Sequence, residues 1–179
     1  MLLNFPPDRR GFVCDSDAES ALISHQCISK MLSVNYVDNA TVTALDAYMD
    51  IFTADSKNDT RNLKVYPAYT VEIELPKSEK VNVFAVSEFV EAGERVNGFA
   101  LEAVDDRGNT ELLYSGESIG FYRAVRIKEG KYKRLKFTVI SALAKPLLMN
   151  FGIHYFEDYV LQSIDLKSND GANIVKSIE

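Results

Sequence analysis

The sequence has few residues of the kinds that build metal centres, disulfide frameworks or membrane spans. It holds two cysteines and two histidines among 179 residues, without a close Cys/His cluster, so no zinc site is expected. On one helix, Cys14 and Cys27 would have Cα atoms roughly 20 Å apart, beyond the reach of a disulfide. No window approaches 18 consecutive apolar residues, and the first residues lack the basic-then-apolar layout of a signal peptide. The sequence therefore predicts neither a transmembrane helix nor a leader.

Runs of basic residues are also absent, and 26 acidic residues outnumber 20 basic ones for a formal net charge of -6. This balance argues against nucleic-acid binding as the main activity. A hydrophobic share of 46% and a charged share of 26% are those of an ordinary globular chain. With 179 residues, the chain has room for one domain and an appendage. A complete (β/α)8 barrel, which needs about 250 residues, is excluded.

The first part of the chain predicts one α-helix. Ser16 and Glu19 have the spacing of a capping box, and the helix is expected to reach about Leu32. A narrow polar stripe separates two sides that carry apolar or small residues: Ala18, Ala21, Leu22, Ile28 and Leu32 on one, and Ile23, Cys27 and Met31 on the other. Such a helix either has partners on two sides or lies buried in a single core. The residues alone leave both alternatives open.

After residue 35 the hydrophobic period changes to two, which is typical of half-buried strands. Residues 70–75 and 134–139 alternate apolar and polar side chains. Further strands are expected at 81–90, 99–104, 111–114, 121–127 and 147–156, separated by turn-forming segments at 76–78, 91–93, 105–109 and 128–131. About seven short strands with such turns predict an antiparallel β-sandwich. The core of this fold is expected to contain Phe52, Phe84, Phe89, Phe99, Phe137 and Phe151.

Four segments in order resemble motifs of one enzyme family. Leu2–Gly11 (LLNFPPDRRG) resembles the segment LLN-x-PPD-x-RG that closes the catalytic barrel of family 29 glycoside hydrolases, the α-L-fucosidases. Val86–Phe99 (VSEFVEAGERVNGF) is similar to L-x-E-x-I-x-x-G-Q-R-V-x-x-F of their C-terminal domain. Ser118–Arg123 and Ala144–Gly152 are similar to T-x-I-G-Y-K-R and A-x-P-x-I-x-x-F-G. These motifs span most of the chain.

The resemblance implies a division of the chain into three parts. Residues 1–34 would be the terminal loop and last helix of an absent (β/α)8 barrel, 35–160 the C-terminal β-sandwich, and 161–179 a polar tail or linker. The sandwich would be a jelly-roll of the galactose-binding, discoidin-like kind. The family's catalytic carboxylates lie in barrel segments that this chain lacks, so no catalytic residue is carried over and the chain alone is expected not to be an enzyme. The family resemblance also implies a periplasmic or extracellular location.

Five residues are candidates for ligand contacts. Tyr48, Tyr122 and Arg123 are candidate sugar-binding residues, because aromatic faces and a planar guanidinium suit rings with polar edges. Structural or wet-face roles are their alternatives. Asp46 and Asp50 offer hard oxygens for a structural calcium ion, and a solvated loop is the alternative. No other cofactor is expected.

Two functions remain for this chain. The first is a non-catalytic accessory domain that docks on and stabilises the missing catalytic barrel of a fucosidase-like enzyme. The second is a carbohydrate-binding module for fucosylated or galactose-containing glycans. Without the barrel, the helix side with Ile23, Cys27 and Met31 predicts self-association, because apolar surface is driven out of water.

Overall fold

A computed structural model describes residues 33–56 and 59–156. These residues form eight β-strands and two short 3-10 helices, η1 and η2. Their bounds are η1 Tyr36–Asn39, β1 Thr41–Ala44, β2 Phe52–Ser56, β3 Asp59–Tyr66, β4 Thr70–Glu88, η2 Val90–Ala92, β5 Val96–Val104, β6 Thr110–Gly116, β7 Arg123–Ala142 and β8 Leu148–His154. No helix within the described ranges is long and apolar enough to cross a membrane.

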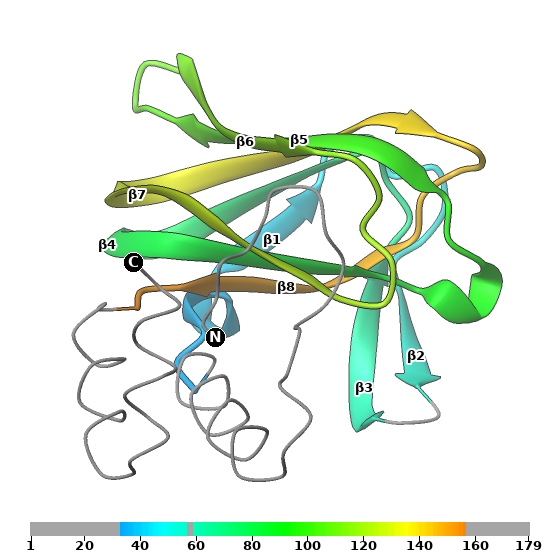
Figure 1. Cartoon of the computed structure of the whole chain (residues 1–179). Coiled ribbons are helices and arrows are strands. Elements are labelled where there is room, and N and C mark those ends of the chain that lie inside the picture. Colours follow the sequence, from blue (N-terminus) through cyan, green and yellow to red (C-terminus); the bar gives the residue numbers. More distant parts are fainter. Residues whose placement is uncertain (1–32, 57–58, 157–179) are drawn as a thin grey trace, which may run out of the picture.

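All eight strands belong to one hydrogen-bonded antiparallel sheet with the order β2-β3-β8-β4-β7-β5-β6, and β1 pairs with β4 (Figure 1). The prediction of a mainly β, antiparallel fold is confirmed. The expected division into two separate sheets is not confirmed, because β4 and β7 run continuously through the whole arrangement. The predicted N-terminal α-helix lies outside the described residues, and the described part holds no α-helix.

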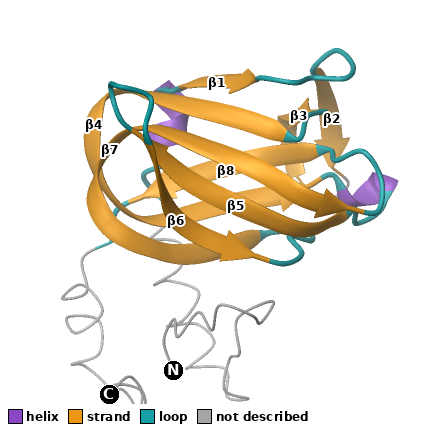
Figure 2. Ribbon diagram, turned by 90° about the horizontal axis from the view of Figure 1, so that it is seen from above, coloured by secondary structure: helices purple, strands orange, loops and turns teal. Residues whose placement is uncertain are grey.

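Strands β4 and β7 are long because two expected turns are bends inside strands. Residues 76–78 lie within β4 and residues 128–131 within β7, where the sequence alone predicts turns. Pro76 has no N–H to donate to the ladder, and the register between β4 and β7 shifts between Glu74 and Glu79. The pairing then resumes, with Val83 opposite Arg126. The chain therefore bends without turning back, and the sheet curls over on itself (Figure 2).

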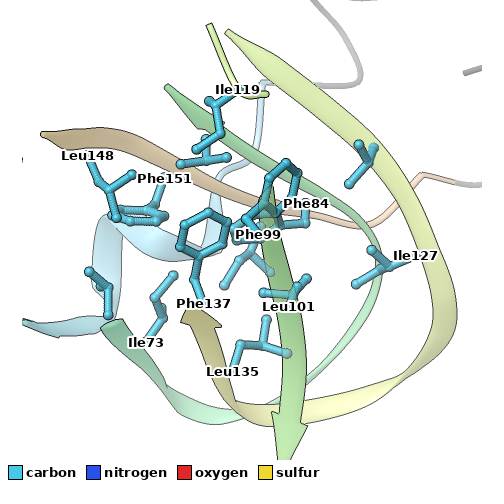
Figure 3. Packing of buried hydrophobic residues seen from close by; sticks show 14 of the residues in the cluster. Ile73, Phe84, Phe99, Leu101, Ile119, Ile127, Leu135, Phe137, Leu148 and Phe151 are labelled. Carbon is cyan, nitrogen blue, oxygen red and sulfur yellow. The ribbon is translucent and has the colours of Figure 1, made fainter. Parts of the chain in front are cut away.

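The curled sheet encloses one main apolar core. Phe84 of β4 and Phe137 of β7 stack with ring centroids 5.7 Å apart, and Phe99 of β5 lies 5.2 Å from Phe137. Phe151 of β8 meets Phe137 edge-on at 5.8 Å, so the four rings point toward one another (Figure 3). The expected core positions of these phenylalanines are confirmed. Phe52 and Phe89 are partly buried against a smaller cluster that contains Ala54, Val65, Leu147 and Met149.

The polar residues that alternate with the core residues of β4 and β7 lie on the outer, solvent-facing side of the sheet, as predicted. Val71, Ile73 and Leu75 are at most 1% exposed, while the alternating glutamates point to solvent. Lys136 pairs with Glu102 at 3.2 Å, and Lys133 with Glu74 at 3.2 Å. Ion pairs that remain at least partly exposed to water, as these do, stabilise a fold by about 1 kcal/mol or less each. The carboxylates of this face are therefore components of a solvated surface.

The turn between β5 and β6 lies in the predicted turn-forming segment 105–109, and it connects two antiparallel strands. The Asp105 carboxylate accepts hydrogen bonds from the side-chain amide of Asn109 (2.8 Å) and from the backbone N–H groups of Asn109 (2.7 Å) and Arg107 (2.8 Å), and these bonds lower the pKa of this carboxyl. Gly108 has φ 85°, a left-handed conformation that glycine adopts without a steric penalty. Side-chain and backbone preferences thus agree at this turn.

Candidate functional site

Five connecting segments meet at the end of the sheet where η2 lies (Figure 2). We call this surface the loop end; it comprises residues 45–51, 67–69, 89–95, 117–122 and 143–147. Backbone hydrogen bonds join the segments, including Phe89 N–H to the Leu147 carbonyl (2.9 Å) and Leu143 N–H to the Arg95 carbonyl (2.7 Å). Tyr48 N–H donates to the Pro67 carbonyl (3.1 Å). The loop end is therefore a connected surface built from distant parts of the sequence.

Glu88 is the central polar group of the loop end. Its side chain is 2% exposed. One carboxylate oxygen accepts from Arg95 N–H (2.8 Å) and Val96 N–H (3.0 Å), and the other accepts from Gly120 N–H (3.2 Å). Glu88 thus joins two of the three motifs that resemble the fucosidase C-terminal domain, and the Phe89–Leu147 hydrogen bond joins the third to them. Glu88 is not among the residues predicted to contact a ligand, although alternation from Phe84 and Val86 places it on the inward side of β4.

Arg95 binds the backbone of two loops at the loop end. Its guanidinium donates to the backbone carbonyls of Lys145 (2.7 Å) and Ala92 (3.0 Å). Gly93, with φ 92°, makes the turn after η2. The carboxylate of Glu88 instead binds the backbone of Arg95. Both groups therefore fix loop conformation through main-chain atoms.

Tyr48, a candidate sugar-binding residue, is held within the loop end. Its hydroxyl donates to the Pro146 carbonyl, and the Lys145 ammonium lies 4.9 Å from the centre of its ring. Tyr69 packs against it at 6.4 Å, with the two rings tilted by 59°. Burial raises the pKa of Tyr48. One face of the ring is thus in contact with a cation, while Tyr69 is 37% exposed and presents the more accessible aromatic surface.

The two candidate calcium ligands differ in their surroundings. One oxygen of Asp46 accepts from the backbone N–H groups of Tyr69 (3.1 Å) and Thr70 (2.8 Å), which ties its loop to the start of β4. Asp50 is exposed in the same loop. Calcium takes six to eight oxygen ligands, and in the described ranges no group of three or more acidic, histidine or cysteine side chains gathers. This pair alone does not fit a calcium site.

Arg123 and Tyr122 have neighbours different from those of Tyr48. Arg123 is 9% exposed and donates to the Ser118 carbonyl (2.9 Å) and the Tyr114 hydroxyl (3.1 Å), with its guanidinium 5.8 Å from the centre of the Phe99 ring. It shares the inward side of β7 with core residues rather than a wet face. Burial raises the pKa of Tyr122 to about 12. The structure therefore gives these two candidates mostly buried surroundings.

Exposed apolar side chains also occur at the loop end and its margin. Their exposure is not predictable from the sequence, because isolated apolar residues in loops have no periodic signal. Leu143 is 79% exposed and Ile140 is 68% exposed, both at the end of β7. Leu45 and Met49, in the segment bonded to residues 67–70, are 55% and 53% exposed. Contiguous exposed apolar surface is a common mark of an interaction site.

A hollow of about 390 Å³ lies away from the loop end, where the β5–β6 hairpin meets the bends of β4 and β7. Acidic and basic residues line it in equal number, three of each, so it has no dominant charge: Asp105, Asp106, Glu111, Lys131, Lys133 and Arg134. Several of them already have partners, such as Glu111 with Lys128 at 2.5 Å. The hollow is therefore a poor candidate for selective binding of an ion.

The sequence and the fold were compared with those of known proteins. No protein-family model matches the chain. A rice protein (Oryza sativa subsp. japonica), provisionally named α-L-fucosidase 1, is 26% identical over 191 residues, covering all of this chain and 36% of the rice protein. A GH29 fucosidase of Ruminococcus gnavus, solved in complex with fucose, has a TM-score of 0.60 at 19% identity over 80% of this chain and 31% of its own.

A smaller protein shares the fold alone. The Clostridium perfringens module CpGH89CBM32-5, solved in complex with GalNAc-β-1,3-galactose, has a TM-score of 0.53 at 16% identity, and covers 67% of this chain and 98% of its own. The fucosidase matches are different in kind, because this chain spans only about a third of each of them. In sequence and fold, the chain is similar to the C-terminal part of α-L-fucosidases of glycoside hydrolase family 29.

Proposed function

We propose that this chain is a non-catalytic accessory domain of a fucosidase-like glycoside hydrolase, which docks on a catalytic barrel and stabilises it. The observation that carries the proposal is the match to the C-terminal part of a fucosidase, over 36% of that protein's length. Retaining glycosidases need two carboxyl groups about 5 Å apart across a sugar cleft. The carboxylates of the wet face are paired with lysines, and Glu88 binds backbone N–H groups. Their roles are those of structural groups.

The loop end supports a protein partner. Leu143 and Ile140 expose most of their aliphatic side chains, and burial of apolar surface contributes roughly 25 cal/mol per Å². Aliphatic groups suit a protein surface, whereas sugar rings are usually recognised by aromatic faces and polar groups. Glu88 and Arg95 hold the underlying loops through main-chain atoms. A surface with little conformational freedom loses little entropy when it docks.

A chimera tests docking. The C-terminal third of the rice relative is replaced by this chain, and hydrolysis of an aryl α-L-fucoside and the melting temperature of the barrel are measured. We expect the chimera to be active and to melt roughly 5 °C above the barrel alone, because a bound domain stabilises the folded state. Leu143→Asp should remove much of this gain. Leu112→Asp, at an exposed position on β6, is the matched control and should keep it.

Two results would contradict the proposal. Turnover of the fucoside by this chain alone would show that it carries a catalytic centre. A chimera that melts no higher than the barrel alone, with Leu143→Asp and Leu112→Asp indistinguishable from it, would remove the docking role. The chain alone is expected to give no turnover above the rate without protein.

A carbohydrate-binding module is the second candidate, favoured by the fold shared with CpGH89CBM32-5. On this hypothesis the loop end binds a fucosylated or galactose-containing glycan through Tyr48 and Tyr69, with Lys145 beside them. Calorimetric titration with fucose, galactose and lactose at millimolar concentration would then show saturable binding, which Tyr48→Ala weakens at least about tenfold. Tyr155→Ala is the control, because Tyr155 also carries a lysine, Lys80, 4.3 Å from its ring centre. Absence of binding at sugar concentrations up to about 10 mM would exclude this function.

A further inference from the structure

The hollow of about 390 Å³ lies at the end of the domain opposite to the loop end (Figure 1). Strand β4 begins and ends at the loop end, so its bend at 76–78 marks the far end of the fold. The hollow lies between this bend, the bend of β7 and the β5–β6 hairpin. A partner that occupies only the loop end therefore leaves the hollow open to solvent.

The ladder between β4 and β7 opens beside the hollow. Glu74 and Glu79 are successive paired positions of β4, but their partners on β7, Arg134 and Tyr132, are only two residues apart. Residues 75–78 of β4 therefore stand against a single residue of β7. An excess of residues on one strand bends that strand and disrupts the local pairing. The opening thus follows from the backbone register.

The hairpin beside the hollow is held in one conformation. The Asp105 carboxylate accepts hydrogen bonds from the side-chain amide (2.8 Å) and the backbone N–H (2.7 Å) of Asn109. The Arg134 guanidinium donates to the main-chain carbonyl of Asp105, which ties the hairpin to β7. Within β7, the Tyr132 hydroxyl donates to the Lys128 carbonyl (2.8 Å) across the bend. A preformed hollow of this kind loses little conformational entropy when a ligand binds.

Apolar and polar groups both line the hollow. Tyr132 belongs to the main core and Ala103 packs against that core, so carbon atoms form part of the lining. Ser78 of β4 and Thr110 of β6 contribute hydroxyl groups, which can donate and accept hydrogen bonds. The lining is therefore amphipathic.

The charged side chains of the hollow differ in whether they have partners. Glu111 and Lys133 already form ion pairs, at 2.5 and 3.2 Å. Asp106 and Lys131 are exposed, and within the described ranges neither side chain has an ion-pair or hydrogen-bond partner. The hollow thus offers one carboxylate that accepts and one ammonium that donates, and their charges cancel.

We propose that the hollow is a binding site for a neutral mono- or disaccharide. A sugar has apolar C–H faces and hydroxyl groups that donate and accept, which match the carbon atoms of Tyr132 and the polar groups of Asp106 and Lys131. The volume of about 390 Å³ falls at the low end of the range for small-molecule sites, about 300–1,000 Å³. The site does not depend on the proposed function, because a domain docked through its loop end still holds a glycan at its other end.

Amide NMR spectra of the full chain locate the sugar. Glucose, galactose, L-fucose and lactose are each titrated up to about 10 mM, and at least one should shift the amides of residues 103–111 and 131–134 saturably. Amides of residues 45–51 and 143–147, at the loop end, should keep their positions. The affinity should change less than about twofold between about 0.05 and 0.5 M sodium chloride, because salt screens the attraction of charged ligands only.

Two substitutions at exposed positions test the contacts. Asp106→Ala and Lys131→Ala should each weaken sugar binding at least about fivefold, because each removes a hydrogen bond between the sugar and a charged group. Asp55→Ala and Lys64→Ala, at exposed positions on β2 and β3, are the matched controls and should keep the affinity. Substitutions at exposed positions rarely affect folding, so all four variants remain comparable.

Three results would overturn the inference. The first is a spectrum that none of the four sugars changes. The second is sugar binding that Tyr48→Ala weakens while Asp106→Ala and Lys131→Ala do not, because that result places the sugar at the loop end. The third is a response of the hollow to glycine or sodium sulfate but to no sugar, which would assign a charged ligand. Docking is measured by the melting temperature of the chimera, so the two proposals fail on different measurements.

Discussion

Replacing Glu88 by alanine is expected to lower the free energy of unfolding by about 3–4 kcal/mol, because each buried donor left without an acceptor costs about 1–3 kcal/mol. The carboxylate accepts from three backbone N–H groups, those of Arg95, Val96 and Gly120, at 2.8–3.2 Å. These donors lie at the start of β5 and in the loop that precedes β7. Alanine would remove the acceptor for all of them and leave a small cavity. The loss is measured by urea denaturation at neutral pH.

Two further substitutions separate the carboxylate from the side-chain volume. Glu88→Gln keeps the shape and one acceptor oxygen, so a loss of about 1–2 kcal/mol is expected. Glu117→Ala, at an exposed position in the adjoining loop, should change stability by less than about 0.5 kcal/mol. If Glu88→Ala and Glu117→Ala gave the same midpoint, the carboxylate would not organise the loop end. A change in the denaturant slope alone would also contradict the assignment.

The sequence predicts strands where apolar and polar side chains alternate, because a strand that buries one face places an apolar residue at every second position. Residues 70–75 and 134–139 are examples, and both lie in the observed β4 and β7. It does not predict that 76–78 and 128–131 are bends. Proline and glycine mark a break in the ladder, but the outcome depends on whether a partner strand is available beyond the break. In this fold β4 and β7 pair with each other both before and after their bends.

The same limit applies to the candidate site. Tyr48 and Asp46 are candidate ligand residues whose hydrogen-bond partners in the structure are backbone atoms distant in sequence, and Arg123 binds the backbone of Ser118, five residues before it. The sequence contains no information on such contacts without the fold. Alternation does contain a usable signal for Glu88 and Arg123, because both are in phase with core residues of their strands. An ionisable residue in phase with a core indicates a buried, hydrogen-bonded group.

The bend of the sheet makes a specific energetic prediction for Phe137. Within the ladder, Phe84 lies opposite Val125 and Phe137 lies opposite Val71, so flat strands would keep the two rings far apart. The curl brings them to 5.7 Å, nearly parallel, and adds contacts from Phe99 and Phe151. Phe137→Ala should therefore lower the free energy of unfolding by about 3–5 kcal/mol. Phe121→Ala, whose ring is 63% exposed, should cost less than about 0.5 kcal/mol.

A double-mutant cycle converts this stability change into a test of the fold itself. Phe84→Leu and Phe137→Leu are milder substitutions, expected to cost about 1–1.5 kcal/mol each. If the two halves of the sheet face each other, the double variant should not lose the sum of the two single losses in free energy of unfolding, as measured in urea. The difference should be roughly 0.5–1.5 kcal/mol, the usual coupling energy of packed aromatic rings. Phe84→Leu with Phe121→Leu is the control pair and should be additive. Additivity in the first pair would show that the rings are not in contact, because only the curled sheet brings these positions of β4 and β7 together.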